Sequence, residues 1–237
     1  MYMQNDGQRI HPRERLSCAI ELLGGARVVA DVGCDHGRLS CTLIQQEIAQ
    51  RCIAIDISEP SLQKAERLIH RIGLQDRIET RLGDGLKMLQ PGEADAIAIL
   101  GMGGTLIAQI LDVTPPLMGA TKCVMQPMRG AEDIRKWLYE RNYPVLEDRV
   151  VFDADRYYQV FSVGAPSPES QDIPAGWPEN CFSLGYTAFE KREPLMKPLV
   201  SQMLATTRRK LRSQRAEALV LQATQLEQIL EQWDQER

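Results

Sequence analysis

The chain lacks the long apolar segments that membrane proteins and exported precursors carry. None of its hydrophobic runs approaches the ~20 residues that a membrane-spanning helix requires. Its N-terminal stretch, MYMQNDGQRIHPRER, is polar and basic, without the apolar core of a secretory signal. The sequence therefore predicts a cytoplasmic protein that does not associate with membranes.

Metal-binding patterns are also scarce. The chain has three histidines, which are far apart in the sequence, and its six cysteines form no C-x-x-C pair. Several of these cysteines fall within apolar segments, as buried, reduced thiols of cytosolic proteins do. We therefore expect no disulfide framework and no metal site.

Aromatic residues and net positive charge are both low. Aromatic side chains make up 5% of the chain, so few are available to stack on nucleic-acid bases; Trp137, Tyr157 and Tyr158 are candidates. A net charge of −4 argues against a surface covered with phosphate-binding side chains, although it leaves room for a local basic patch.

From about Arg27 to Gly164 short apolar runs alternate with helix-like segments, which predicts βαβ units and a parallel sheet with right-handed crossovers. The predicted strands are 28–32, 52–56, 77–82, 95–100 and 122–125, and the predicted helices are 38–49, 59–72, 104–112 and 130–141. Two of the runs are almost continuously hydrophobic, which is typical of strands covered on both faces.

The pattern changes after the fifth predicted strand. Segments 145–151 and 157–163 are predicted to form a hairpin with a polar turn at 153–155, which would complete a seven-stranded sheet. Residues 165–180 are rich in proline and polar residues and are predicted to be a linker. We therefore expect an α/β domain at 1–164 and a helical domain at 181–237.

Within 181–237 apolar residues recur at helical spacing, with no proline or glycine after Pro198. The pattern fits one long helix or a helical hairpin. We favour the hairpin, because a single helix of that length would leave its apolar stripe exposed.

The turn after the first predicted strand is glycine-rich and acidic: Asp31-Val-Gly33-Cys34-Asp35-His36-Gly37. Glycine lets the backbone turn tightly and approach a ligand closely. A nicotinamide dinucleotide site would have glycine in place of Asp35, whose carboxylate would repel a pyrophosphate. S-adenosylmethionine has no phosphate but a cationic sulfonium, so the acidic turn favours it over NAD. An ordinary strand-to-helix turn is the alternative.

Acids also follow the second and third predicted strands. Asp56 can accept hydrogen bonds from both ribose hydroxyls of an adenosyl group, although Ser58-Glu59-Pro60 beside it also indicates a helix start. Asp84 lies in Leu82-Gly83-Asp84-Gly85, where methyltransferases commonly bind the adenine amino group. The three acids together predict an S-adenosylmethionine site more specifically than any one of them.

The fourth predicted strand is followed by Leu100-Gly101-Met102-Gly103-Gly104. A loop with few side chains would let a flat base approach the methyl group; glycines needed only for the turn are the alternative. The Asn/Asp-Pro-Pro-Tyr/Phe motif of exocyclic-amine methylation is absent, as is the Pro-Cys of cytosine-C5 chemistry. A ring nitrogen, whose lone pair is already free, is therefore the favoured target.

With these motifs the chain resembles the bacterial tRNA (adenine-22-N1)-methyltransferase family over nearly its whole length. The resemblance rests on the turn at 31–36, on 81–86, on Gly101-Met-Gly-Gly104, and on Gln126-Pro127 with the following 135–138 segment. Met128 stands where the family commonly has asparagine, and Asp56 where many members carry glutamate.

The resemblance implies a Rossmann-like, seven-stranded methyltransferase domain with a C-terminal helical, coiled-coil-like domain. It implies transfer of a methyl group from S-adenosyl-L-methionine to N1 of adenine 22 in tRNA. The cofactor-binding residues that we predict are Asp31, Gly33, Cys34, Asp35, His36, Asp56, Ile57, Gly83, Asp84, Gly85, Leu100 and Gly101. For catalysis we predict Asp31, His36, Gly101, Met102 and Gly103, and for substrate binding Gly103, Gly104, Gln126 and Pro127.

Basic residues gather in the C-terminal segment and predict a clamp on the RNA backbone, which would release phosphate counterions. The predicted contacts are Arg208, Arg209, Lys210 and Arg212, near Lys191, Arg192, Lys197 and Arg215. A solvated helix face is the alternative. Arg9, His11, Arg13 and Arg15 could form a second basic arm. His36 would orient the base or relay a proton, or else make a structural hydrogen bond at the start of a helix.

Two other classes of protein stay open. One is a methyltransferase of a small molecule or protein whose helical domain serves dimerisation. The other is a non-catalytic RNA-binding protein with the same fold, which the presence of Asp31, Asp56 and Asp84 disfavours.

Overall fold

The computed structural model describes residues 13–112, 116–167, 177–178, 181–214 and 216–235. The predicted basic residues Arg9, His11 and Arg215 lie outside the described residues, as does most of the predicted linker 165–180.

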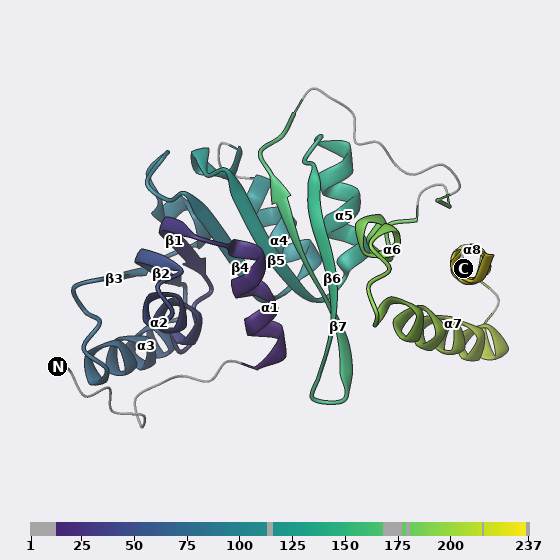
Figure 1. Ribbon diagram of the computed structural model, residues 1–237, viewed down its shortest axis with the longest axis horizontal. Coiled ribbons are helices and arrows are strands. Elements are labelled where there is room, and N and C mark those ends of the chain that lie inside the picture. Colours follow the sequence, from purple (N-terminus) through teal and green to yellow (C-terminus); the bar gives the residue numbers. More distant parts are fainter. Residues whose placement is uncertain (1–12, 113–115, 168–176, 179–180, 215, 236–237) are drawn as a thin grey trace.

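Seven strands of the described chain form one sheet in the order β3-β2-β1-β4-β5-β7-β6 (Figure 1). They are β1 Ala26–Val32, β2 Ala49–Asp56, β3 Ile78–Leu82, β4 Ala96–Gly103, β5 Lys122–Arg129, β6 Val145–Asp153 and β7 Arg156–Gly164. The first five strands are parallel, and β7 pairs antiparallel with both β5 and β6. The predicted seven-stranded Rossmann-like sheet is confirmed.

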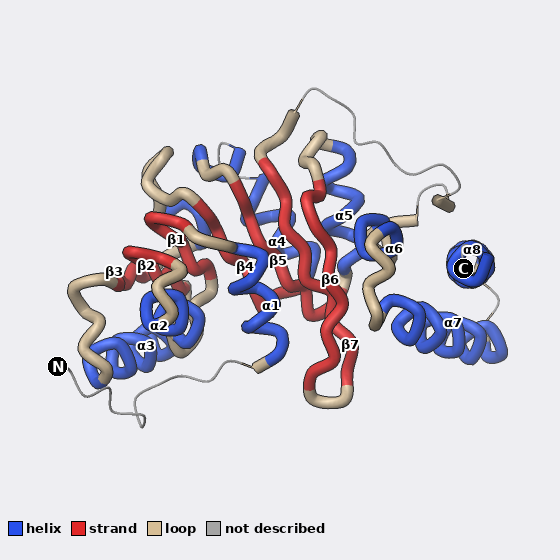
Figure 2. Tube along the Cα trace, in the orientation of Figure 1, coloured by secondary structure: helices blue, strands red, loops and turns tan. Residues whose placement is uncertain are grey.

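Helices cover both faces of the sheet (Figure 2). The helices α1 Glu14–Leu23, α2 Arg38–Gln45 and α3 Glu59–Arg71 pack on one face, and α4 Gly104–Asp112 and α5 Ala131–Glu140 on the other. In β1, Val28, Ala30 and Val32 face the α4 side while Val29 faces the α2 side, as the period of two requires. Burial on both faces explains why central strands such as β1 and β4 are almost continuously apolar. Two 3₁₀ turns, Gly85–Met88 and Pro116–Gly119, complete this region.

Local chemistry sets the element boundaries. The Ser58 hydroxyl accepts a hydrogen bond from the Ser61 amide at 3.4 Å and, with Pro60 in the first turn, begins α3 as predicted. The predicted hairpin turn forms with Ala154 and Asp155 at φ values of 49° and 59°, the left-handed conformation of tight hairpins. The predicted helix 38–49 is too long, because α2 ends at Gln45 and β2 already begins at Ala49.

Helix α1 was not among the predicted helices, although its sequence carries the pattern. Ala19, Ile20 and Leu23 are buried against the sheet at helical spacing. Arg13 and Arg15, at the beginning of this segment, are instead predicted from the sequence to belong to a second basic arm. Arg13 and Arg15 therefore lie at the start of a packed helix.

The prediction of a loop at Gly101–Gly103 is wrong, whereas the predicted helix 104–112 is confirmed as α4. Strand β4 continues to Gly103, with Met102 opposite Pro127 and Gly103 opposite Arg129 after shifts in register. Gly101 has a φ of 77°, a conformation that favours glycine, and lies at this irregularity. Gly104 is the first residue of α4, and a Cβ there would lie 1.8 Å from the Gly130 carbonyl oxygen. Glycine at 104 thus allows α4 to approach the start of α5.

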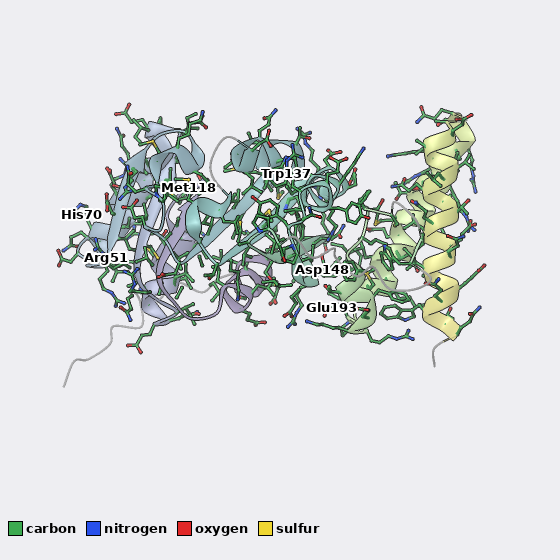
Figure 3. All side chains as sticks on the ribbon, turned by 90° about the horizontal axis from the view of Figure 1, so that it is seen from above. Arg51, His70, Met118, Trp137, Asp148 and Glu193 are labelled. Atoms are coloured by element: carbon green, nitrogen blue, oxygen red, sulfur yellow. The ribbon has the colours of Figure 1, made fainter. Side chains whose placement is uncertain are left out.

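The C-terminal region contains α6 Tyr186–Glu190, α7 Met196–Ser213 and α8 Glu217–Gln235. Gln214 is extended (φ −148°, ψ 129°), so the chain reverses between α7 and α8, and the predicted hairpin is confirmed. Leu199, Leu204 and Leu226 belong to their shared core. The hairpin lies beyond β6, at the opposite end of the sheet from β3 (Figures 1 and 3). Val150 of β6 contributes to the same core.

A buried ion pair and the hydrogen bonds that Asp148 makes beside it join α5 and the C-terminal region to the sheet. Nη2 of Arg135 on α5 lies 2.7 Å from Oδ1 of Asp148 on β6, and the Thr187 hydroxyl on α6 donates to Asp148 Oδ2 at 2.8 Å. The Asp148 amide donates back to the Thr187 oxygen at 2.7 Å. The Arg135 guanidinium also lies 4.5 Å from the Phe161 ring centroid. Figure 3 shows Asp148 on the side that faces the C-terminal helices.

We predict that Gly104→Ala lowers the free energy of unfolding by about 1–3 kcal/mol, because the methyl group would overlap the Gly130 carbonyl and push α4 away from α5. Gly25→Ala is the matched control, since a Cβ there has no neighbour within 4 Å. Urea unfolding of both variants measures the difference. Equal stabilities would contradict the packing role of Gly104.

We predict that Arg135→Met destabilises the protein by about 3–5 kcal/mol, because it leaves the Asp148 carboxylate buried without its cation. Lys136→Met on the same helix is the control. Its side chain is exposed and 3.9 Å from Glu140, so we expect a change within about 0.5 kcal/mol. Thermal unfolding that shows similar losses for both variants would contradict this account.

Candidate functional site

A cavity of about 560 Å³ opens at the carboxyl ends of the parallel strands. It lies where the strand order reverses between β1 and β4, the position at which open α/β sheets bind ligands. Its walls come from β1, β2, β4, β5, the loops that follow β1, β2 and β3, and helices α1, α2 and α4. The lining residues are Arg13, Arg15, Leu16, Asp31, Val32, Gly33, Cys34, Asp35, His36, Arg38, Leu39, Ile55, Asp56, Ile57, Gly83, Asp84, Gly85, Leu100, Gly101, Met102, Leu106, Ile110 and Gln126.

Asp31 is the most deeply buried acid of this cavity, with 3% of its surface exposed. Its Oδ2 accepts hydrogen bonds from the Ser40 hydroxyl at 2.7 Å and the Ser40 amide at 3.3 Å. Burial outweighs these two hydrogen bonds and raises the pKa of Asp31 to about 6. A carboxylate in this state gains most from a cationic ligand, because that ligand would offset the cost of burying the charge.

The turn after β1 is held in shape by glycines and by Asp56. Gly33 has a φ of 75°, and a Cβ there would lie 2.0 Å from the Met102 methyl carbon. Asp35 has a φ of 48°, and its amide donates to Asp56 Oδ2 at 2.9 Å. His36 Nδ1 bonds to the Asp35 carboxylate, and both side chains are largely exposed. His36 therefore lies on the cavity rim.

Asp56 and Asp84 line the neighbouring part of the cavity. Oδ1 of Asp56 accepts from the Ser58 amide at 2.8 Å, so the carboxylate supports both the turn after β1 and the start of α3. Asp84 is exposed and pairs with Lys87, while Ile57 beside them has 73% of its surface exposed. The two interpretations offered for Asp56, a helix start and a ligand acid, are compatible in this geometry.

The β4 and β5 side of the cavity is formed by Leu100, Gly101, Met102 and Gln126. Gln126 is 3% exposed, and its Nε2 donates to the Pro127 carbonyl oxygen at 2.9 Å. The other predicted substrate residues of this region, Gly103 on β4, Gly104 at the start of α4 and Pro127 on β5, do not line the cavity. Gly104 packs against Gly130, and Pro127 is buried.

Helix α1 supplies a wall that the sequence did not reveal. The Arg15 guanidinium binds Asp153 Oδ2 through Nε at 2.8 Å, and it lies 4.4 Å from the Tyr158 ring centroid. Its Nη1 lies 3.2 Å from the Met128 sulfur. The apolar spacing of α1 was the available signal. Arg38, Leu39, Leu106 and Ile110 also line the cavity and were not predicted.

The predicted basic residues of the C-terminal region lie away from this cavity. Arg208 pairs with Glu227 at 2.8 Å, and Arg209, Lys210 and Arg212 are exposed on α7, beyond β6. They could contact only a ligand large enough to reach both regions. Their binding role stays a prediction.

Three further features of the described residues complete the description of the site. No three His, Cys, Asp or Glu side chains are grouped so that they could hold a metal ion. No described helix is both long and apolar enough to cross a bilayer. Burial raises the pKa of the Cys34 thiol, which lines the cavity, so this cysteine is a poor nucleophile.

Comparisons with known proteins place the chain. Residues 13–161 match the family model of a methyltransferase domain. The tRNA (adenine(22)-N(1))-methyltransferase of Bacillus subtilis is 36% identical over 148 residues, which cover 62% of this chain and 62% of that relative's length. The solved B. subtilis m1A22 tRNA methyltransferase is 27% identical with a TM-score of 0.75, covering 96% of this chain and 99% of that one.

A further solved structure agrees in fold. M. capricolum TrmK, solved with S-adenosylhomocysteine, has a TM-score of 0.76 at 20% identity and covers 94% of this chain and 98% of that one. The family model matches well over half of the chain and includes every acid of the cavity. The chain belongs to the methyltransferase-domain family.

Proposed function

We propose that this protein transfers a methyl group from S-adenosylmethionine to N1 of adenine 22 in tRNA. The observation that carries the proposal is the cavity lined by Asp31 and Asp56, at the carboxyl ends of β1 and β2, and by Asp84, in the turn after β3. The substrate and the position follow from the similarity to the B. subtilis enzyme. Because tRNA is the substrate, we place the reaction in the cytoplasm.

The residues present fit the cofactor. The cavity volume of about 560 Å³ is that of a small-molecule site, and its acids suit a ligand with ammonium and sulfonium charges. Exposed apolar surface on Ile57 and Leu106 can cover the faces of an adenine. Two backbone amides orient the Asp56 carboxylate, so it is positioned to accept hydrogen bonds from the ribose hydroxyls.

The strand order assigns roles along the cavity. Asp56, at the end of β2, would hold the ribose, and Asp84, after β3, would hold the adenine. Asp31 on β1 and Gly33 in the turn after it would hold the amino-acid end of the cofactor. When bound, the cofactor supplies an electrophilic methyl group, which belongs beside β4. Gly101, Met102 and Gln126 would then form the wall around the target base. The protein contributes position and electrostatics, because the N1 lone pair requires no base.

Exposed arginines support a nucleic-acid substrate. Arg13 and Arg38 line the cavity, Arg129 follows at the end of β5, and none pairs with an acid in the described part of the chain. With Arg209, Lys210 and Arg212 on α7 they offer contacts for phosphates at the cavity and at a distance from it. His36 on the rim is proposed to orient the base.

The second candidate is a methyltransferase of a small molecule or protein that dimerises through its C-terminal helices. It is favoured by Val220 and Leu221 on α8, which are 53% and 57% exposed. Binding of tRNA that weakens steeply with salt would support the first function over the second, because phosphate contacts release counterions.

We predict that the full chain with S-adenosylmethionine labels a tRNA transcript carrying adenine at position 22, and that nucleoside analysis finds 1-methyladenosine. The matched transcript with adenine 22 replaced by cytosine should take no label. Label in another nucleoside would contradict the target atom. No label in either RNA, with the cofactor bound, would favour the second candidate.

We predict that Asp31→Asn weakens S-adenosylmethionine binding by about 10- to 100-fold at pH 7.5, because a charge-assisted contact is lost. For the unmodified protein, affinity should rise as the pH increases through about 6 and level off above it, since the carboxylate must be ionised. Calorimetric titration from pH 5 to 8 measures both effects. A variant that binds like the unmodified protein would contradict the role of Asp31.

The same substitution should stabilise the free protein. Because the pKa of Asp31 is raised on folding, its protonated form stabilises the fold at low pH, and this contribution is lost as the pH rises through about 6. Asp31→Asn should therefore raise the free energy of unfolding by about 1–3 kcal/mol at pH 7.5. Asp155→Asn, in the exposed hairpin turn, is the control and should change neither the affinity for S-adenosylmethionine nor the free energy of unfolding.

A further inference from the structure

We propose that the side-chain oxygen of Gln126 accepts a hydrogen bond from the exocyclic amino group of the target adenine. Gln126 would thereby select adenine and stabilise the charge that methylation creates. The inference rests on the proposed function and assigns the residue that reads the base.

The sheet places Gln126 on the substrate side of the cavity. It lies opposite Leu100 in the β4–β5 pair, while the proposed cofactor acids lie on β1, β2 and the loop after β3. A ligand that enters past β4 therefore meets β5 next. Gln126 is the residue of β5 that lines the cavity, and only 3% of its surface is exposed.

The hydrogen bonds of the Gln126 amide fix which end faces the ligand. Nε2 donates to the Pro127 carbonyl oxygen at 2.9 Å and lies 3.7 Å from the Met128 sulfur. The opposite amide orientation would set two carbonyl oxygens against each other, so the assignment is determined by chemistry. Oε1 accepts no hydrogen bond from any described residue and is not sealed from the cavity. An accessible acceptor on a buried side chain is thus left for a ligand donor.

Adenine supplies that donor next to the reacting atom. As the N1 lone pair bonds to the methyl carbon, the carbon–sulfur bond breaks and its electron pair stays on sulfur. The positive charge passes to the adenine and spreads over N1, C6 and N6. An amide oxygen at the N6 amino group therefore binds more strongly as transfer proceeds. Guanine carries an oxygen at C6, which would face the Gln126 oxygen and repel it.

Other polar groups of the cavity are less suited to this contact. Asp31 of β1 is held by Ser40 of α2, and the Arg15 guanidinium is a donor that already binds Asp153 and lies against the Tyr158 ring. On the rim, Asp35 and His36 are bonded to each other, so the backbone carbonyls of Leu100 to Met102 are the main competing acceptors. Substitution of Gln126 would remove the side-chain contact and leave the backbone carbonyls in place, so a mutation can distinguish the two kinds of acceptor.

The test compares two tRNAs, one with adenine and one with unsubstituted purine at position 22, in single-turnover methyl transfer. Gln126→Leu should slow transfer to adenine by about 10- to 100-fold and transfer to purine by less than about threefold. Purine lacks the amino group but keeps N1, so a merely structural role would lower both rates equally. In the presence of S-adenosylhomocysteine, Gln126→Leu should likewise lose the preference for binding the adenine tRNA over the purine tRNA.

Gln159→Leu is the matched control. Gln159 lies on β7, donates to the Ser183 carbonyl oxygen at 3.0 Å and does not line the cavity. The control substitution should leave the adenine-to-purine ratio unchanged. Equal slowing of both RNAs by Gln126→Leu would overturn the inference and favour the backbone acceptors. An unmodified protein that methylates neither RNA while binding the cofactor would instead overturn the proposed function.

Discussion

The reversal of strand order between β1 and β4 is the constraint on which the rest of the structure depends. The chain places β2 and β3 on one side of β1 and then returns to place β4 and β5 on the other. Right-handed crossovers put the intervening helices on opposite faces, so the carboxyl ends of β1 and β4 stay uncovered. The cavity forms there, and every acid proposed to bind the cofactor reaches it from the carboxyl end of β1, β2 or β3.

Buried charge has two different roles in this protein. Asp31 lacks a cationic partner among the described residues, and its burial costs stability that a cationic ligand can offset. Asp148 is fully partnered by Arg135 and Thr187, and it fixes α6 against β6. The environment of Asp31 is suited to binding a cationic ligand, and that of Asp148 to holding α6 on the sheet, although both carboxylates are almost fully buried.

Much of the fold could be predicted from sequence, because strands such as β1 and β4 are buried on both faces and are apolar along their length. The acids Asp31 and Asp56 could be predicted because each lies at the carboxyl end of such a strand. Asp84 was signalled by the Gly-Asp-Gly turn after β3, an edge strand that is only partly buried. Helix α1 was missed because charged residues begin it. The path of Gly101–Gly103 was mistaken for a loop because a bulged strand and a turn use glycine alike. The orientation of the Gln126 amide has no sequence signal, since it depends on the Pro127 carbonyl beside it.

The most direct test of the central claim is a crystal structure of the full chain with S-adenosylhomocysteine. The account predicts the adenosyl group between Asp56 and Asp84, the amino group at Asp31, and the sulfur directed toward Met102 and Gln126. Ligand density in the reverse direction, or outside the cavity, would contradict the assignment of roles to the strand ends.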